Sequence, residues 1–418
     1  MREMKDSGIE WVGAIPQDWQ LSKIGSLYTQ RNEKVSDKDY QPLSVTMQGI
    51  LPQLATAAKT NDGDNRKLVR VGDFAINSRS DRRGSCGISP LDGSVSLINI
   101  ILTPRTAMHP GYYNWLFHTT LFADEFYKWG HGIVADLWTT RWQEMKSITV
   151  PVPEYAEQER IAAFLDAECA EIDAVLEKTR ASIEEYKKLK QAVITQAVTK
   201  GIRGDRPMKD SGIEWIGEIP AEWNKDKVIR VFSVIGSGTT PKSSDENLFD
   251  GNTPWIQSGD INGENLFVTK NCVSNSAIES YSALRVYQAP YLVVAMYGAS
   301  VGNLSLSMID ACVNQACCVL KKPTINLKFS FYIFKAVKDY LARKAVGGGQ
   351  PNISQETIKQ LWLPIPSADE QIKISNYLDE KCRSVDALIA KKQQYLTEIE
   401  NYKKSLIYEY VTGKKEVV

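Results

Sequence analysis

The chain has 418 residues, enough for two or three domains, and 43% of them are hydrophobic, as in an ordinary globular protein. Lysine plus arginine equals aspartate plus glutamate at 50 each, which argues against a protein that coats nucleic acid regardless of sequence. No apolar run reaches about 18 residues and the seven cysteines form no CxxC pair, so we expect a cytoplasmic protein with no membrane span and no cysteine-held metal.

A short segment near the start of the chain returns half-way along it. MKDSGIEWVGAIPQDW starts at Met4, MKDSGIEWIGEIPAEW starts at Met208, and twelve of the 16 positions are identical. A second pair of segments starts at prolines, with PVPEYAEQERIAAFLDAECAEIDAV at Pro151 and PIPSADEQIKISNYLDEKCRSVDAL at Pro364. The chain therefore consists of two homologous halves, and a period of about 200 residues indicates domains rather than the short repeats of a solenoid.

The first body, between the Trp-containing segment and Pro151, is predicted to mix strands with helix. LVRVGDFAINS and SVSLINIILTP have the apolar, β-branched character of strands, whereas YYNWLFHTTLFADEFYKW is typical of a helix. The loop SRSDRRGSCG carries arginines, which can pair with a guanine edge or a phosphate. The candidate DNA contacts in this loop are Arg79, Arg82 and Arg83, and further cations stand just before it at Arg66, Lys67 and Arg70.

A long helix is predicted after the first body, and its apolar residues follow a heptad pattern. Two rows recur every seven residues: Leu165, Ile172, Thr179, Tyr186 and Val193, and Ala162, Cys169, Leu176, Ile183, Lys190 and Ala197. The second half repeats both rows 213 residues later: Leu378, Val385, Lys392, Ile399 and Leu406, and Ser375, Cys382, Ile389, Leu396, Lys403 and Tyr410. The polar members of these rows would weaken the seam while fixing its register.

The second body is again predicted to be α+β, with a strand in YLVVAMYG and a helix in FSFYIFKAVKDYLARKAV. Three polar turns provide candidate DNA contacts, because glutamine suits an adenine edge and hydroxyls or lysine suit phosphate. These candidates are Thr239, Thr240, Lys242, Gln257 and Gln350. The two bodies have little sequence identity, which is what two different half-sites would require.

The two helices are expected to pair with each other in antiparallel orientation. Each spans about 40 residues, or roughly 60 Å at 1.5 Å per residue, and a lone solvated helix of that kind is marginally stable. The second body joins the end of the first helix to the start of the second, so both ends must meet there. Counting from Pro364 through the C-terminus to Met4 gives 58 residues, against 57 from Pro151 to Met208, so we expect the termini to lie together, as in a cut circle.

Motifs of catalysis are absent from the sequence. There is no GxxxxGK[ST], no GxSxG, no HExxH and no Asn-Pro-Pro-aromatic motif of an amino-methyltransferase. The three histidines, His109, His118 and His131, all stand in the first half, so they cannot form a chemistry shared by the two halves and are interpreted as core or surface residues. We therefore expect no catalytic, cofactor or metal site in this chain.

Three features together resemble the specificity subunits of Type I restriction-modification systems: KDSGIEW-x-G-x-IP-x-x-W, the P-x-P lead-in followed by EQ and a hydrophobic-Leu-Asp helix start, and SGTTPK with PWIQSGDI. The resemblance covers nearly the whole chain in the order typical of the family. It implies an α+β chain in which two globular α/β target recognition domains are separated by two long antiparallel coiled-coil helices, with a pseudo-two-fold, cyclic repeat. We assign 1–155 and 201–366 to the recognition domains and 156–200 and 367–418 to the spacer helices.

The resemblance also implies partners. The two domains would bind a bipartite, asymmetric site in double-stranded DNA, and two modification subunits with S-adenosylmethionine would methylate adenine. Restriction subunits that need ATP and Mg²⁺ would join for cleavage, so this chain would be a non-catalytic subunit.

Other interpretations stay open at this point. The helices could belong to the core of a bundle without a spacer role, and the bodies could bind proteins in a non-catalytic interaction scaffold. A nuclease or methyltransferase that acts alone is a further alternative. The sequence does not distinguish a system that only methylates from one that also restricts.

Overall fold

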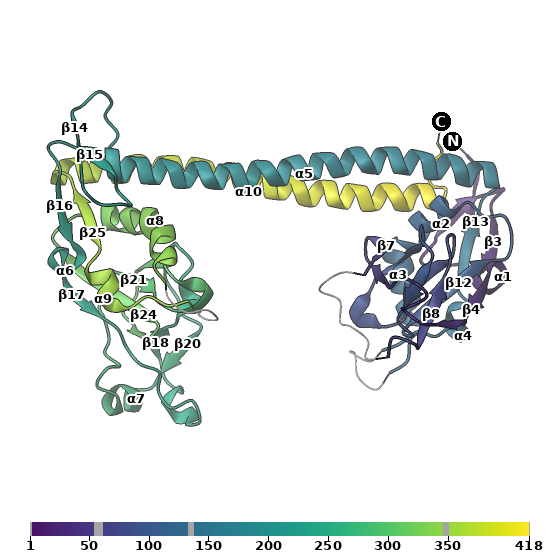
Figure 1. Ribbon diagram of the computed structural model, residues 1–418, viewed down its shortest axis with the longest axis horizontal. Coiled ribbons are helices and arrows are strands. Elements are labelled where there is room, and N and C mark those ends of the chain that lie inside the picture. The colour runs from purple at the N-terminus through teal and green to yellow at the C-terminus, as the bar shows by residue number, and fades with distance from the viewer. Residues whose placement is uncertain (1, 54–61, 133–137, 346–350, 418) are drawn as a thin grey trace. The chain divides into compact units, whose positions relative to one another are not determined.

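The computed structural model describes residues 2–53, 62–132, 138–345 and 351–417. The chain divides into two compact units, which we call unit 1 (Met1–Arg180 with Gln393–Val418) and unit 2 (Ala181–Lys392). Each unit contains one body and one part of each of the two long helices (Figure 1). The division into four segments predicted from the sequence stays a prediction.

Unit 1 is built on a four-stranded antiparallel sheet that lies against short helices. Its order is β10 (Cys86–Ile88), β9 (Phe74–Asn77), β12 (Asn99–Pro104) and β4 (Tyr28–Arg31). A second sheet has the order β11 (Gly93–Val95), β8 (Arg66–Val69) and β5 (Lys34–Val35). Three pairs complete the strands: β1 (Met4–Asp6) with β2 (Ala14–Pro16), β3 (Gln20–Lys23) with β13 (Thr149–Val152), and β6 (Leu43–Thr46) with β7 (Gly49–Pro52). The short helices are α1 (Ile24–Leu27), α2 (Pro110–Phe117), α3 (Thr120–Lys128) and α4 (Trp142–Met145).

Unit 2 repeats this plan with an additional strand at one edge of the main sheet. The order is β17 (Phe232–Gly236), β24 (Cys317–Pro323), β21 (Tyr291–Ala295), β22 (Leu304–Ser307) and β19 (Asn265–Leu266). The second sheet has the order β20 (Asn271–Val273), β18 (Thr253–Ile256) and β23 (Cys312–Val313). The remaining strands pair β14 (Met208–Asp210) with β15 (Glu218–Pro220), and β16 (Asn224–Lys227) with β25 (Trp362–Ile365). The helices of the body are α6 (Val228–Val231), α7 (Asn275–Ser280), α8 (Leu327–Arg343) and α9 (Gln355–Lys359).

Two predicted elements of the first body are each divided in two. The strand predicted from Leu68 turns at Gly72, whose φ of 88° few other residues adopt, so that β8 and β9 belong to different sheets. The helix predicted from Tyr112 ends at Phe117, and Thr119 caps a new helix by accepting a hydrogen bond from the Phe122 amide (3.2 Å). Apolar character alone did not reveal either break.

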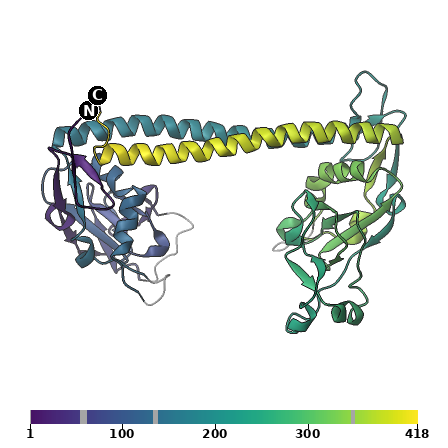
Figure 2. The same ribbon diagram turned by 180° about the vertical axis from the view of Figure 1, so that it is seen from behind.

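The two long helices, α5 (Tyr155–Lys200) and α10 (Ala368–Val411), pair in antiparallel orientation within each unit (Figures 1 and 2). In unit 1 the Lys403 ammonium contacts Asp173, and in unit 2 the Lys190 ammonium contacts Asp386, each at 2.6 Å. The four residues are related by the 213-residue offset, so one ion pair is the pseudo-two-fold counterpart of the other. All positions of the predicted seam are buried or half-buried, which confirms the coiled-coil prediction.

The repeated Trp-containing segment anchors the start of each long helix to its own body. Trp223 is buried and its indole N–H donates to Glu370 (2.8 Å), which also receives a hydrogen bond from Arg206 (2.6 Å). In unit 1 the indole of Trp19 donates to Glu157 (2.9 Å), and Arg2 forms the corresponding ion pair with Glu157. The conserved spacing of tryptophan and glutamate is therefore explained by a structural junction that both units share.

The N-terminal and C-terminal segments meet in unit 1, as the cyclic spacing predicts. The Tyr408 hydroxyl donates to the carbonyl of Val12 (3.0 Å), and the Tyr112 hydroxyl donates to that of Val411 (2.8 Å). Leu165 of α5 and Leu406 of α10 belong to the same hydrophobic core as the strands of the first body. The second long helix thus returns to the first domain and completes its core.

Candidate nucleic-acid interface

The arginine-rich loop of unit 1 follows the central strand β9 and forms a 3-10 turn over Ser80–Arg82. Arg83 forms an ion pair with Asp124, and Arg82 lies 3.7 Å from Asp81. Arg79 is exposed and, among the described residues, its guanidinium has no carboxylate within ion-pair distance. Of the three predicted contacts, Arg79 is therefore the cation whose charge is most available to a ligand.

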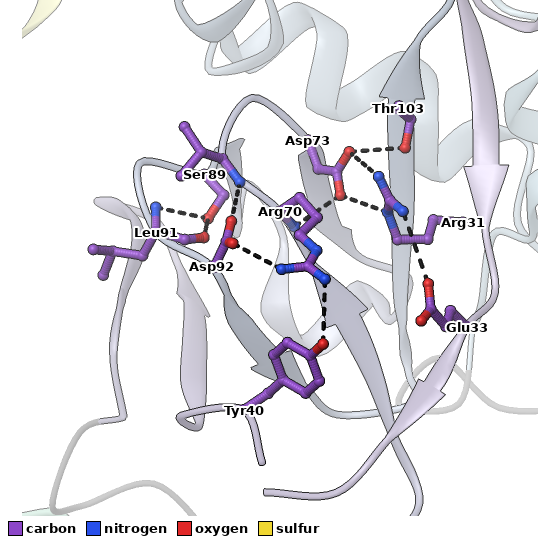
Figure 3. A network of polar contacts seen from close by, with 10 residues as sticks. Arg31, Glu33, Tyr40, Arg70, Asp73, Ser89, Leu91, Asp92 and Thr103 are labelled. Atoms are coloured by element: carbon purple, nitrogen blue, oxygen red, sulfur yellow. Dashed lines mark hydrogen bonds and ion pairs between the residues drawn. The ribbon is translucent and has the colours of Figure 1, made fainter.

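The other cations predicted in this region serve the fold. Arg66 is buried and donates to the hydroxyl and carbonyl of Ser94, and Lys67 donates to the carbonyl of Asn99. Figure 3 shows Arg70 between Asp92, at 2.9 Å, and the hydroxyl of Tyr40, at 3.2 Å. Its hydrogen bond to Asp92 raises the pKa of Arg70. The sequence cluster therefore separates into residues that hold strands together and a loop that faces outward.

The candidates of unit 2 lie on loops that hydrogen bonds join at one end of the main sheet. The Thr240 hydroxyl donates to the Gln315 side chain (2.6 Å), and the Gly238 amide donates to the carbonyl of Asn314 (3.3 Å). The Asn314 amide in turn donates to Ile256, the neighbour of Gln257 (3.0 Å). A Cβ at Gly238 would lie 1.7 Å from the Val313 carbonyl oxygen, so only glycine allows this approach.

The remaining predicted contacts have different surroundings. Lys242 is exposed, and its amide donates to the Tyr281 hydroxyl (3.1 Å). Thr239 is half-buried beside Thr240. The side-chain oxygen of Gln257 already accepts a hydrogen bond from Asn271 (2.6 Å). Gln350 lies outside the described residues. The structure thus brings Thr239, Thr240 and Gln257 to connected loops, and their contact with DNA stays a prediction.

A cation-lined cavity in unit 2 was not predicted. It has a volume of about 620 Å³ between α8 and the paired helices, and its lining includes Lys190, Lys328, Lys335 and Arg383. Lys190 and Lys328 pair with Asp386 and Asp379, whereas Lys335 lies over the Phe331 ring and has no ion pair among the described residues. Burial, followed by the nearby charge of Lys190, lowers the pKa of Lys335. An anion in this cavity would relieve that unfavourable environment.

Lys338 extends this basic surface along α8. It is exposed and lines an adjoining cavity of about 340 Å³ together with Lys187 and Lys335. Lys335 and Lys338 are three residues apart and therefore share a helix face. That spacing was the available signal in the sequence, but it is common on solvated helices.

No group of three or more His, Cys, Asp or Glu side chains within the described ranges is arranged to hold a metal ion. His118 is largely buried, and burial lowers its pKa, whereas His131 is exposed. Over the same ranges, no helix has the length and apolar character that a membrane crossing needs.

Comparison with known proteins identifies similar sequences. Residues 220–401 match the model of the Type I restriction modification DNA specificity domain. The Type I restriction enzyme MjaVIII specificity subunit of Methanocaldococcus jannaschii is 23% identical over 96% of this chain and 94% of its own length. The MjaX specificity subunit of the same organism is 24% identical over 66% of this chain, and the match spans only 61% of that relative.

A solved structure supports the fold. A chain from a study of complex assembly and conformational transition of the type I R-M system superposes with a TM-score of 0.75. The match covers 96% of this chain and 99% of the other, at 15% sequence identity. The arrangement of two mixed bodies and two long helices is therefore that of a known fold.

Proposed function

Since the chain belongs to the family of Type I restriction-modification DNA specificity subunits, we propose that its two bodies each bind one half of a bipartite, asymmetric DNA site. Unit 1 would bind one half-site and unit 2 the other. The observation that carries the proposal is that two units of one topology present different side chains on their loops. Equal scaffolds place the two surfaces equivalently, and unequal loops give each its own base sequence.

Partners supply the chemistry in this proposal. Two modification subunits would bind S-adenosylmethionine and methylate adenine, and restriction subunits would use ATP and Mg²⁺ for cleavage, while this chain is non-catalytic. The cytoplasm, where the DNA and these partners meet, is the proposed location. The neutral net charge supports a subunit that binds DNA tightly only when its partners add contacts.

The basic cavity of unit 2 offers a test of DNA binding against the protein-scaffold alternative. We expect the double substitution Lys335→Ala and Lys338→Ala, in the complex with modification subunits, to weaken specific and non-specific duplex binding alike. Because each lysine would neutralise one phosphate, the slope of log K against log salt should fall by about 2. Fluorescence anisotropy over a series of salt concentrations measures this slope.

The matched control is Lys391→Ala, which removes an exposed lysine of α10 outside both cavities. It should leave the slope of the wild-type complex unchanged. A scaffold that binds only proteins predicts no duplex affinity in any of these complexes, and an unchanged slope in the double variant would exclude phosphate contact by the cavity.

A further inference from the structure

The two units carry the same loop at the end of the same strand, although their sequences differ. In unit 1 the loop follows β9, and in unit 2 it follows β21. Each forms a 3-10 turn, over Ser80–Arg82 and Gly298–Ser300, and each ends at a glycine with positive φ, 76° at Gly84 and 79° at Gly302. The loops therefore correspond at an offset of 218 residues, which neither the 204-residue nor the 213-residue repeat reveals.

Backbone hydrogen bonds establish this correspondence residue by residue. Three bonds of unit 1 have counterparts at the 218-residue offset: Ser78 N to Ile98 O (3.3 Å) with Met296 N to Ala316 O (2.7 Å), Asn77 N to Ser85 O (2.9 Å) with Ala295 N to Asn303 O (2.8 Å), and Ser85 N to Arg82 O (3.0 Å) with Asn303 N to Ser300 O (2.8 Å). Isolated β-bridges also correspond, between Arg79 and Thr139 and between Tyr297 and Asn352. Arg79 and Tyr297 thus occupy one position of the shared fold.

The side chains at this position differ in chemistry. Arg79 is an exposed cation, whereas Tyr297 is an aromatic side chain with 45% of its surface exposed. Within the described part of the chain, the Tyr297 ring stacks on no other ring and its hydroxyl forms no hydrogen bond. Single exposed aromatic residues are common on protein surfaces, but this one stands where the other unit presents its available arginine.

Tyr297 also lies beside the other candidates of unit 2. The bond from the Met296 amide to the Ala316 carbonyl places it next to the segment that holds Gln315. Gln315 accepts the hydrogen bond of Thr240, so the loops of Thr240, Gln315 and Tyr297 meet at one end of the sheet. Predicted contacts and the tyrosine therefore form one surface.

We propose that Arg79 and Tyr297 are equivalent specificity-determining residues, each of which selects one base of its own half-site. This inference rests on the proposed function. The Arg79 guanidinium donates two hydrogen bonds to O6 and N7 of a guanine in the first half-site. The Tyr297 ring packs against the methyl group of a thymine in the second half-site, because that methyl is the apolar feature of the major groove.

The test is adenine methylation mapped across a genome in cells that express the full chain with its modification subunits. Arg79→Ala should reduce discrimination at one position of the first half-site by about 5- to 150-fold and leave the second unchanged. Tyr297→Ala should do the reverse. Tyr297→Phe keeps the ring and should preserve the wild-type motif, whereas Tyr297→Arg should favour guanine at that one position.

The outcomes separate this inference from the function on which it rests. A wild-type chain that directs no bipartite methylation would overturn the proposed function itself. A normal wild-type motif that both alanine variants leave unchanged, or that each relaxes in both half-sites, would overturn only the roles of Arg79 and Tyr297. Thermal melting of the purified complexes verifies folding, and uniform loss of methylation by a folded Tyr297→Arg complex also contradicts the inference.

Discussion

Deletion of one heptad from each long helix is expected to abolish methylation at the native DNA site while the chain stays folded. The deletion removes Glu177–Ile183 from α5 and Gln393–Ile399 from α10. Both seams then continue in phase, because each loses one complete heptad. The helices shorten by about 10.5 Å at 1.5 Å per residue, which is about three base pairs at 3.4 Å each. Three base pairs also rotate the duplex by roughly 100°, so the two half-sites could no longer be contacted together.

Binding to the native site and to sites with altered spacers, measured with the modification subunits present, would test this expectation. A helix content and a melting temperature close to those of the wild type establish that the pairing survives. Deletion from α5 alone serves as the comparison, since it misaligns Asp173 with Lys403 or Lys190 with Asp386 and should lower stability. Native-site methylation that persists after the matched deletion would show that the helices do not set the spacing.

The second large effect is expected at the junction between Trp223 and α10. Glu370→Ala should destabilise unit 2 by roughly 3–5 kcal/mol, because it leaves the buried Arg206 guanidinium without its carboxylate. The Trp223 indole N–H also loses its acceptor in a buried site. For a unit of this size, each kcal/mol lowers the melting temperature by about 2–4 °C. Differential scanning calorimetry of the full chain would measure the change.

Glu380→Ala is the matched control on the same helix, because Glu380 is exposed and its carboxylate has no ion pair among the described residues. Its effect should stay within about 0.5 kcal/mol. Glu157→Ala, which removes the counterpart in unit 1, should destabilise that unit instead. Equal melting of the Glu370 and Glu380 variants would contradict the structural role of the junction.

The long-range architecture could be predicted because it depends on repeated patterns. The heptad rows of α5 and α10 show which faces pair, and the spacing around Pro151, Met208 and Pro364 shows that the termini meet. Glu157 and Glu370 were visible as repeated residues. Their partners Arg2 and Arg206 were not identified, because those arginines stand two residues before the repeated segment and far from the glutamates in sequence.

The loops could be predicted only in part because their equivalence lies in the backbone. Arg79 attracted attention through its charge, whereas Tyr297, in an uncharged turn, did not. Arg66 and Arg70 have the same chemistry as Arg79, and only the strand pairing shows that Ser94 and Asp92 hold them. Composition identifies residues able to bind DNA, but tertiary contacts decide which of them are available.

The central claim is that this chain determines which DNA sequence is methylated, and a genome-wide map of methylated adenine tests it most directly. The map should be made in the host with the gene present and with the gene deleted. The account predicts a gapped, asymmetric motif that disappears on deletion and returns with the gene. Identical methylation maps in the two strains, with the modification subunit expressed in both, would contradict it.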